Sequence, residues 1–265
     1  LIAMKSKLQI GLRHILPIYP FLFLLSSRFL KFGKFQRLPK WILVLIIIYP
    51  FNSLLIFPHY LAYFNGLILP SHAYKWVVES NLDWGQDLKG LAKWMRKNDV
   101  KCVYLGYFGS CNPLWYGIRY RFLPSNTAGV DRYHYSPIPT EKEIIAISAT
   151  TYQSVYAPDH RFYQWLHRYK PFSSIGYSIL LFDITGDAYA HLHLGISYYR
   201  IMLFKEAAEE FKRVLEIEPK NPIAWFNLEK VYEIMGDKEK ARKHFEKALK
   251  FAPEINRKKI KDALE

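Results

Sequence analysis

The N-terminal part of the chain is far more apolar than the rest. No Lys, Arg, Asp or Glu occurs from Trp41 to Tyr74. A segment near 41–59 has the length that a helix needs to cross a bilayer, and Pro50 is a kink that such helices tolerate. A second apolar segment near 11–28 is shorter, and it could also be re-entrant or interfacial. We predict a membrane region over 1–69 with two transmembrane α-helices.

The direction of these helices follows from the charge between them. The connecting stretch RFLKFGKFQRLPK carries five basic residues and no acid. Short basic loops of this kind remain on the cytoplasmic side of a membrane. The first helix then runs inward and the second outward. We therefore predict an integral membrane protein, with the lipid bilayer as a partner and residues from about 59 onward extracytoplasmic.

Residues 70–187 alternate short apolar runs with amphipathic stretches. In the sequence QDLKGLAKWMRK, residues 86–97, the apolar positions fall on one face at helical spacing. Strands alternating with helices predict a small extracytoplasmic α/β domain with a mostly parallel sheet. The segment 109–143 is expected to be a long loop or a broken short helix. The expected strands are 75–79, 102–108, 144–148 and 174–184, and a second helix is expected at 160–169.

The string SNLDWGQDL, which begins at Ser80, carries the densest polar chemistry of this region. Ser80, Asn81 or Asp83 is placed to cap the helix that follows, and the helix dipole would stabilise both Asp83 and Asp87. The alternative is a polar site in which these carboxylates bind a cation or a sugar hydroxyl. The chemistry of these residues favours helix capping over a polar binding site.

Residues 188–255 carry the same pattern twice, and the two copies follow each other at a constant interval. The first copy is Leu194, Gly195, Tyr198, Ala207, Phe211 and Pro219, and the second is Leu228, Glu229, Tyr232, Ala241, Phe245 and Pro253. This period and order resemble the tetratricopeptide repeat, a helix–turn–helix unit. We expect an all-α tail of two repeats over 188–255, closed by a charged capping helix at 256–265. Because Glu229 replaces a glycine, the second repeat should be slightly looser.

Repeat arrays of this kind bind other proteins on their inner face. The residues expected on that face are mainly apolar and aromatic, as a peptide or a partner helix requires. The alternative is that the face packs on the preceding domain. The predicted groove consists of Tyr189, Leu192, Ile196, Tyr199, Ile223, Phe226 and Lys230.

The net charge of +14 does not indicate a nucleic-acid partner, because of where the charge lies. Residues 1–74 contribute +8 and flank the apolar segments, whereas 75–187 and 188–265 contribute +3 each. The two cysteines, Cys102 and Cys111, could pair in an oxidising compartment or remain ordinary thiols. No metal-ligand spacing or phosphate-binding loop occurs, so we expect neither a metal nor a cofactor.

Three stretches together resemble a known enzyme family. GLRHILPIYPFLFLLSS, FPHYLAYFNGL and SNLDWGQDLKGLAKW are similar to the C-terminal part of membrane glycosyltransferases of the dolichyl-phosphate-mannose–protein mannosyltransferase superfamily (GT-C fold). The resemblance covers roughly 11–184. It implies a polytopic enzyme that uses a polyprenyl-phosphate sugar donor at the outer face of a membrane.

The resemblance also sets limits on what this chain can do. The family's catalytic acid lies in an early outer loop that has no counterpart here, so no catalytic residue is assigned and the isolated chain should be inactive. Arg13 and His14 belong to the resembling stretch and are candidates for holding the donor phosphate, or for anchoring a helix end to lipid headgroups. The alternative function is a non-catalytic, membrane-anchored repeat scaffold.

Overall fold

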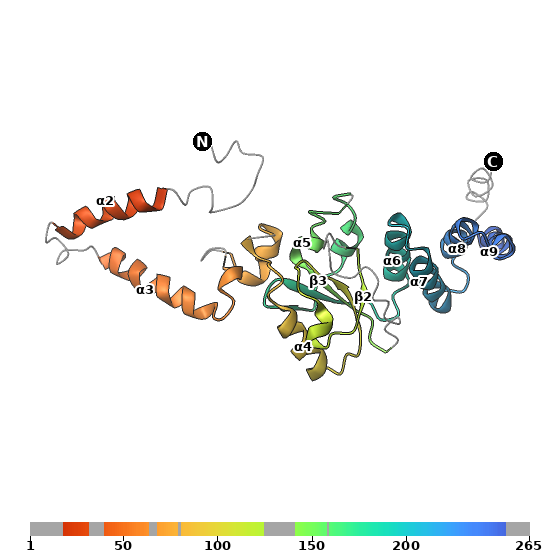
Figure 1. Cartoon of the computed structure of the whole chain (residues 1–265), viewed down its shortest axis with the longest axis horizontal. Helices are drawn as coiled ribbons and strands as arrows, with labels where there is room; N and C mark the ends of the chain where they lie inside the picture. Colours follow the sequence, from red (N-terminus) through yellow and green to blue (C-terminus); the bar gives the residue numbers. More distant parts are fainter. Residues whose placement is uncertain are drawn as a thin grey trace. The chain divides into compact units, whose positions relative to one another are not determined.

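The computed structural model describes residues 18–31, 40–63, 68–78, 81–124, 141–157 and 159–252. The chain forms two compact units (Figure 1). The first unit comprises 1–84 and 176–178, and the second comprises 85–175 and 179–265. The second unit therefore contains both the sheet and the repeat helices, which the sequence suggested as separate domains.

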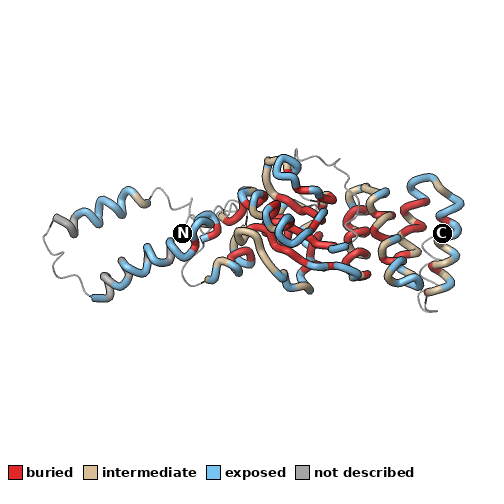
Figure 2. The backbone as a smooth tube through the Cα atoms, turned by 90° about the horizontal axis from the view of Figure 1, so that it is seen from below, coloured by how far each residue is buried: buried red, intermediate tan, exposed pale blue. Residues whose placement is uncertain are grey.

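The first unit contains two apolar helices, α2 (Tyr19–Lys31) and α3 (Lys40–Leu55), followed by the 3-10 turns η4 (Tyr60–Ala62) and η5 (Pro70–Lys75). The apolar side chains of α2 and α3 that are described are largely exposed, as the pale blue helices of Figure 2 show. In the described ranges no helix has both the length and the apolar character for a membrane crossing, since α2 has 13 residues and α3 has 16.

The prediction of a strand at 75–79 is wrong for residues 75–78, the part of this segment that the structure describes. Pro70 opens η5, and its fixed φ favours a helical turn. The carbonyl of Ala73 then accepts hydrogen bonds from the backbone N–H groups of Trp76 and Val77. This local turn keeps Lys75 and Trp76 in helical rather than extended geometry.

The second unit is built on a five-stranded sheet in the order β2-β1-β3-β5-β4. Its strands are β1 (Val103–Gly106), β2 (Tyr120–Phe122), β3 (Ile144–Ser148), β4 (Ser173–Ile175) and β5 (Ile179–Asp183). The sheet is mixed rather than mostly parallel, because β1 pairs in parallel with β2 and β3, while β5 pairs antiparallel with β3 and β4. Short helical segments accompany it: η7 (Pro113–Tyr116), α5 (Ala149–Tyr152) and η8 (Gln164–Arg168).

The differences from the expected strands have local causes. The single strand expected over 174–184 is a hairpin, because Gly176 and Tyr177 both take positive φ, as a tight hairpin turn requires. β2 lies inside the segment expected to be a loop, and three residues are too few for a periodicity signal. The helix expected at 160–169 is present only as η8. Helix α4 (Leu88–Lys97) buries the predicted apolar face against the sheet.

Up to residue 252, where the described part of the tail stops, it consists of four helices: α6 (Ala188–Arg200), α7 (Phe204–Ile217), α8 (Pro222–Ile234) and α9 (Lys238–Phe251). The start of α8 follows the start of α6 by the same interval as the start of α9 follows that of α7, and this interval is the sequence period. Asp187, Asn221 and Asp237 cap α6, α8 and α9 by accepting a backbone N–H three residues on. A mixed α/β unit with a helical repeat tail is thus confirmed; the cap expected at 256–265 lies outside the described residues.

Candidate functional site: a buried joint and an open groove

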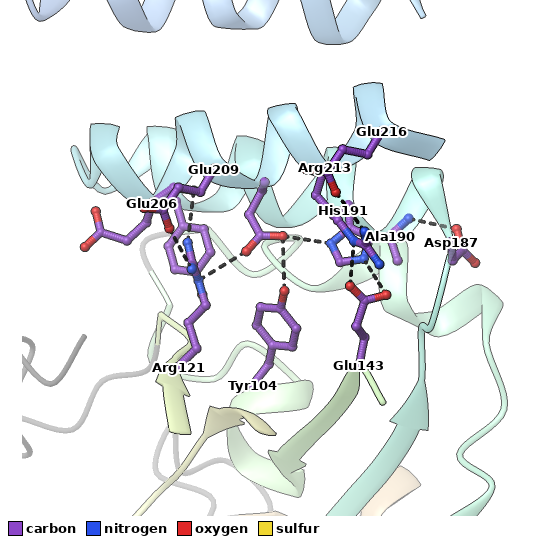
Figure 3. Close-up of polar contacts among 12 residues, drawn as sticks. Tyr104, Arg121, Glu143, Asp187, Ala190, His191, Glu206, Glu209, Arg213 and Glu216 are labelled. Carbon is purple, nitrogen blue, oxygen red and sulfur yellow. Dashed lines mark hydrogen bonds and ion pairs between the residues drawn. The ribbon is translucent and has the colours of Figure 1, made fainter. Parts of the chain in front are cut away.

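A network of buried charges joins the sheet to the first repeat (Figure 3). His191 on α6 lies between two carboxylates, and all three residues are fully buried. Its Nδ1 is 2.8 Å from an oxygen of Glu210, and its Nε2 is 3.3 Å from an oxygen of Glu143. Glu143 comes just before β3 and Glu210 lies on α7. The imidazole therefore links the sheet to both helices of the repeat.

A second arm of the network comes from β2. Arg121 is 1% exposed, and its Nε lies 3.1 Å from Glu210 while one terminal nitrogen lies 2.9 Å from Glu209. Its other terminal nitrogen donates to the backbone carbonyl of Glu206. The Tyr198 hydroxyl on α6 donates to the carbonyl of Phe122 in the same strand. The sheet edge is thus attached to α6 and α7 by charge and by backbone hydrogen bonds.

The third arm balances the remaining charge. Arg213 on α7 donates from Nε to Glu143 at 2.7 Å and from a terminal nitrogen to Glu216 at 2.8 Å. The backbone N–H of Gly186 donates to the other Glu143 oxygen at 2.9 Å. Three cations, Arg121, His191 and Arg213, therefore face the carboxylates of Glu143, Glu209 and Glu210. We call these six residues the sheet–repeat joint.

The pKa values within the joint follow from this pairing. Burial alone would lower the pKa of His191, but its contacts with Glu143 and Glu210 outweigh burial and raise the pKa to about 9. Burial alone would raise the pKa of Glu143, but His191, Arg213 and Gly186 outweigh it and lower the pKa to about 2. At neutral pH the joint therefore holds an imidazolium beside the ionised carboxylate of Glu143. The centre of the joint is buried, and we interpret the joint as a structural contact that positions the repeat; its buried residues are Arg121, Glu143, His191 and Glu210.

An open groove of about 460 Å³ lies between η8 and α6. One wall comes from the residues in and before η8, and the other from α6. The groove is lined by Arg161, Phe162, Gln164, Trp165, Tyr189, His193, Ile196, Ser197 and Arg200, and we call it the α6 groove. Because η8 belongs to the α/β part and α6 to the repeat, neither part forms this groove alone.

The α6 groove combines an aromatic interior with hydrogen-bond donors. The rings of Trp165 and His193 stack at 5.6 Å and 11°, and Tyr189 lies 4.3 Å from His193. Burial and the nearby Arg168 lower the pKa of His193, so this ring is neutral at pH 7. Among the described residues, the buried indole Nε1–H of Trp165 has no hydrogen-bond acceptor. A concave aromatic surface with a few polar groups is typical of a binding site.

The structure distributes the predicted groove residues among several environments. Tyr189 and Ile196 line the α6 groove, whereas Leu192 packs into the apolar cluster between the two repeats. Ile223 on α8 is 53% exposed. Tyr199 packs edge-on against Phe204, and Lys230 lies over the ring of Phe226 at 5.5 Å. A partner-binding role for these residues stays a prediction.

The remaining candidates are more dispersed. The N-cap position of α4 is Asp87 rather than Asn81 or Asp83. Both Asp83 and Asp87 are buried, and a polar site at these residues stays a prediction. Arg13 and His14 lie outside the described residues. Cys102 and Cys111 are not joined by a disulfide. In the described part of the chain no cluster of three or more His, Cys, Asp or Glu side chains could hold a metal ion.

Comparison with known proteins supports the assignment of the second repeat. A tetratricopeptide repeat family model matches residues 223–255, which contain most of α8 and all of α9. No curated protein matches the chain. The repeat family indicates a role in protein–protein interaction.

Sequence reasoning missed the joint because its residues come from distant parts of the chain. A signal was nevertheless present in the repeat frame. The positions of Trp225 and His244 in the second repeat correspond to those of His191 and Glu210 in the first. The second repeat therefore has an aromatic–imidazole pair at these positions, whereas the first repeat has an imidazole–carboxylate pair. This ionic pair, at positions that face the interior of the repeat, was the available signal.

Proposed function

We propose that this protein binds other proteins through its repeats, and that the α/β part holds the first repeat as a rigid mount. The sheet–repeat joint is the observation that supports the rigid attachment of the first repeat to the α/β part. A displacement of α6 and α7 from the sheet would leave buried charges uncompensated, and breaking one such buried pair costs about 3–5 kcal/mol. A partner bound to the repeats would therefore be held in a fixed position relative to the sheet.

The partner-binding face consists of the first helix of each repeat. Ile223 on α8 is exposed, and Tyr189 on α6 is 38% exposed. Exposed aliphatic and aromatic side chains on adjacent repeat helices suit a peptide or a partner helix.

Site-specific photocross-linking in the cells that produce the protein tests this function. A photoreactive phenylalanine analogue at Ile223 should give discrete adducts, identifiable by mass spectrometry. The same analogue at Arg242, whose side chain is 81% exposed on α9, is the matched control. Adducts that form equally at both positions, or at neither, would contradict a partner face on α6 and α8.

The exposed apolar helices support a second candidate function. The side chains of Phe21, Leu22, Phe23, Leu24 and Leu25 on α2 are between 48% and 69% exposed, and α3 exposes Ile47, Leu54 and Leu55 similarly. A continuous exposed apolar surface of this kind marks a site of contact with another protein or with a membrane, and a lipid bilayer would remove it from water. With the resemblance to GT-C glycosyltransferases, this favours the membrane-bound C-terminal portion of an enzyme that uses a polyprenyl-phosphate sugar, with the α/β part and repeats extracytoplasmic.

Two measurements test the second candidate. A membrane-impermeant maleimide should label Cys111, which is half-buried, in intact cells if the α/β part is extracytoplasmic. The resemblance also predicts sugar transfer from a polyprenyl-phosphate donor by the full gene product, with weaker donor binding in Arg13→Ala. Labelling only after cell lysis, or unchanged donor affinity in that variant, would count against this candidate.

A further inference from the structure

The turn η7 and the pocket beside it carry an inference that rests on the second candidate function, the membrane-bound one. We propose that this surface docks the α/β part on the lipid bilayer. The exposed side chains of η7 would enter the headgroup region, and two arginines of the adjacent pocket would bind the phosphate groups of anionic lipids.

The turn η7 is a rigid projection with an apolar tip. Its consecutive side chains Leu114, Trp115 and Tyr116 are 39%, 79% and 37% exposed. The Asn112 side chain accepts the backbone N–H of Leu114 at 3.0 Å, and the N–H of Gly117 donates to the carbonyl of Leu114 at 2.9 Å. Gly117 ends the turn at a φ of +73°, which glycine adopts without strain. The turn is therefore fixed at both ends, while three large side chains remain in water.

A pocket of about 270 Å³ adjoins this tip, since Gly117 belongs to its lining. Arg96, in the last turn of α4, and Arg119, just before β2, also line the pocket and are exposed. In the described part of the chain neither arginine forms an ion pair. Lys101 lines the pocket as well, but it pairs with Asp99, the carboxylate of the lining. The lining thus keeps an excess of two positive charges.

The charges beside the pocket leave this excess in place. Lys142 acts on Asp99, and Glu141 acts on Lys101, so one positive and one negative charge are added. Guanidinium groups bind phosphate oxygens in pairs and are easily desolvated. An open pocket with two exposed and unpaired arginines therefore suits the phosphate group of a lipid.

The size and the composition of the surface favour a bilayer over a protein partner. A stable protein interface buries about 800 Å² on each partner, which is more than the side chains of one short turn supply. Trp and Tyr beside basic residues are characteristic of the boundary between a membrane and water. A bilayer that holds α3 is also tied to the α/β part through residues 56–87, so that even a weak attachment is effective.

Photocross-linking of the full chain in vesicles tests this docking. The chain is reconstituted into vesicles of phosphatidylcholine, either alone or mixed with phosphatidylglycerol, and flotation with the vesicles is measured first. A photoreactive phenylalanine analogue then replaces Trp115. The same analogue at Ile223, which is 53% exposed on α8, is the matched control. Mass spectrometry identifies the adducts.

The analogue at position 115 should form lipid adducts in the mixed vesicles, whereas the analogue at position 223 should form few or none. Similar yields at both positions, or no lipid adduct at position 115 in a chain that floats, would overturn the docking proposal alone. A chain that does not float with either kind of vesicle would overturn both the docking and the membrane-bound candidate function.

Variants test the role of the two arginines. In the mixed vesicles, Arg96→Gln combined with Arg119→Gln should lower the adduct yield at position 115 by about fivefold or more, because each basic residue near anionic lipid adds attraction. The yield in phosphatidylcholine alone should change little. The matched control Arg242→Gln on α9 should behave like wild type. Equal yields in the double variant and in this control would refute the binding of lipid phosphate in the pocket.

Discussion

The two repeats have the same helix positions but differ in what lies against them. α6 and α7 pack on the sheet through the joint, where His191, Glu210 and Arg213 pair with buried groups. Their counterparts at the same positions of the second repeat are Trp225, His244 and Lys247. There the rings of Trp225 and His244 lie 5.2 Å apart, with Lys247 over Trp225 at 4.2 Å. The same three positions carry ion pairs in one repeat and aromatic contacts in the other.

This difference follows from the neighbour on which each repeat packs. The second repeat packs on α7 through Val214 and Ala224, as repeats normally pack on one another. The first repeat has the sheet in that place, and Arg121 and Glu143 project from it. Buried charges on the sheet require opposite charges on the repeat, so the ionic joint is the adaptation of a repeat to a neighbour that is not a repeat.

The largest expected effect comes from breaking the joint. Arg121→Met leaves Glu210 without its Arg121 ion pair in a fully buried position, and should lower the free energy of unfolding of the second unit by about 3–5 kcal/mol. Chemical denaturation followed by circular dichroism measures this. The control Arg242→Met removes an exposed 3.8 Å ion pair in the second repeat and should change stability by less than about 0.5 kcal/mol. Similar stability losses in both variants would mean that the joint contributes no more to stability than an exposed ion pair does.

The pH dependence of the joint is the next largest effect. Because the pKa of His191 is raised to about 9, its stabilising contribution is complete below about pH 6.5 and is lost as pH rises through 9. The free energy of unfolding should fall by roughly 3 kcal/mol between pH 6.5 and 9. The pKa values of His193 and His244 are lowered, so these residues titrate below that window. Denaturation at several pH values checks this, and His191→Gln should remove the slope.

A smaller loss of stability is expected from a substitution at the helix crossing inside the first repeat. A Cβ atom at Gly195 would lie 2.5 Å from the ring of Phe211, which is fully buried. Gly195→Ala should therefore destabilise the first repeat by about 1–3 kcal/mol through overpacking, despite the better helix propensity of alanine. Thermal unfolding of this variant measures the loss. Gly117→Ala, where open space surrounds the position but φ is +73°, separates backbone strain from crowding.

The smallest expected effect is a gain in stability, from a substitution at the equivalent position of the second repeat. Glu229 is 3% exposed, burial raises its pKa, and one of its oxygens has no hydrogen-bond partner among the described residues. Glu229→Ala should stabilise the second repeat by about 1 kcal/mol at pH 7. The gain should shrink as pH falls below the raised pKa, because the protonated wild-type carboxyl is easier to bury. A stability loss in this variant would show that Glu229 makes a favourable contact.

The sequence predicted the elements that rest on local periodicity. The repeat interval placed all four repeat helices, and Leu88, Leu91 and Met95 marked the buried face of α4. The sequence also located β3 at the observed residues, because its run of isoleucines is β-branched and apolar. It failed for β2, which has three residues, and for 75–79, where Pro70 started a turn upstream.

By itself, the sequence determined that this chain contains paired helices at a fixed period, because each helix must bury an apolar stripe that recurs every three to four residues. Only the tertiary structure decided where the charged exceptions to that pattern find partners. Arg121, Glu143, His191 and Glu210 are widely separated along the chain, and nothing local distinguishes a solvated charge from one that meets its opposite across a sheet and two helices. Ionic pairing between distant residues, like the α6 groove, exists only once the chain has folded.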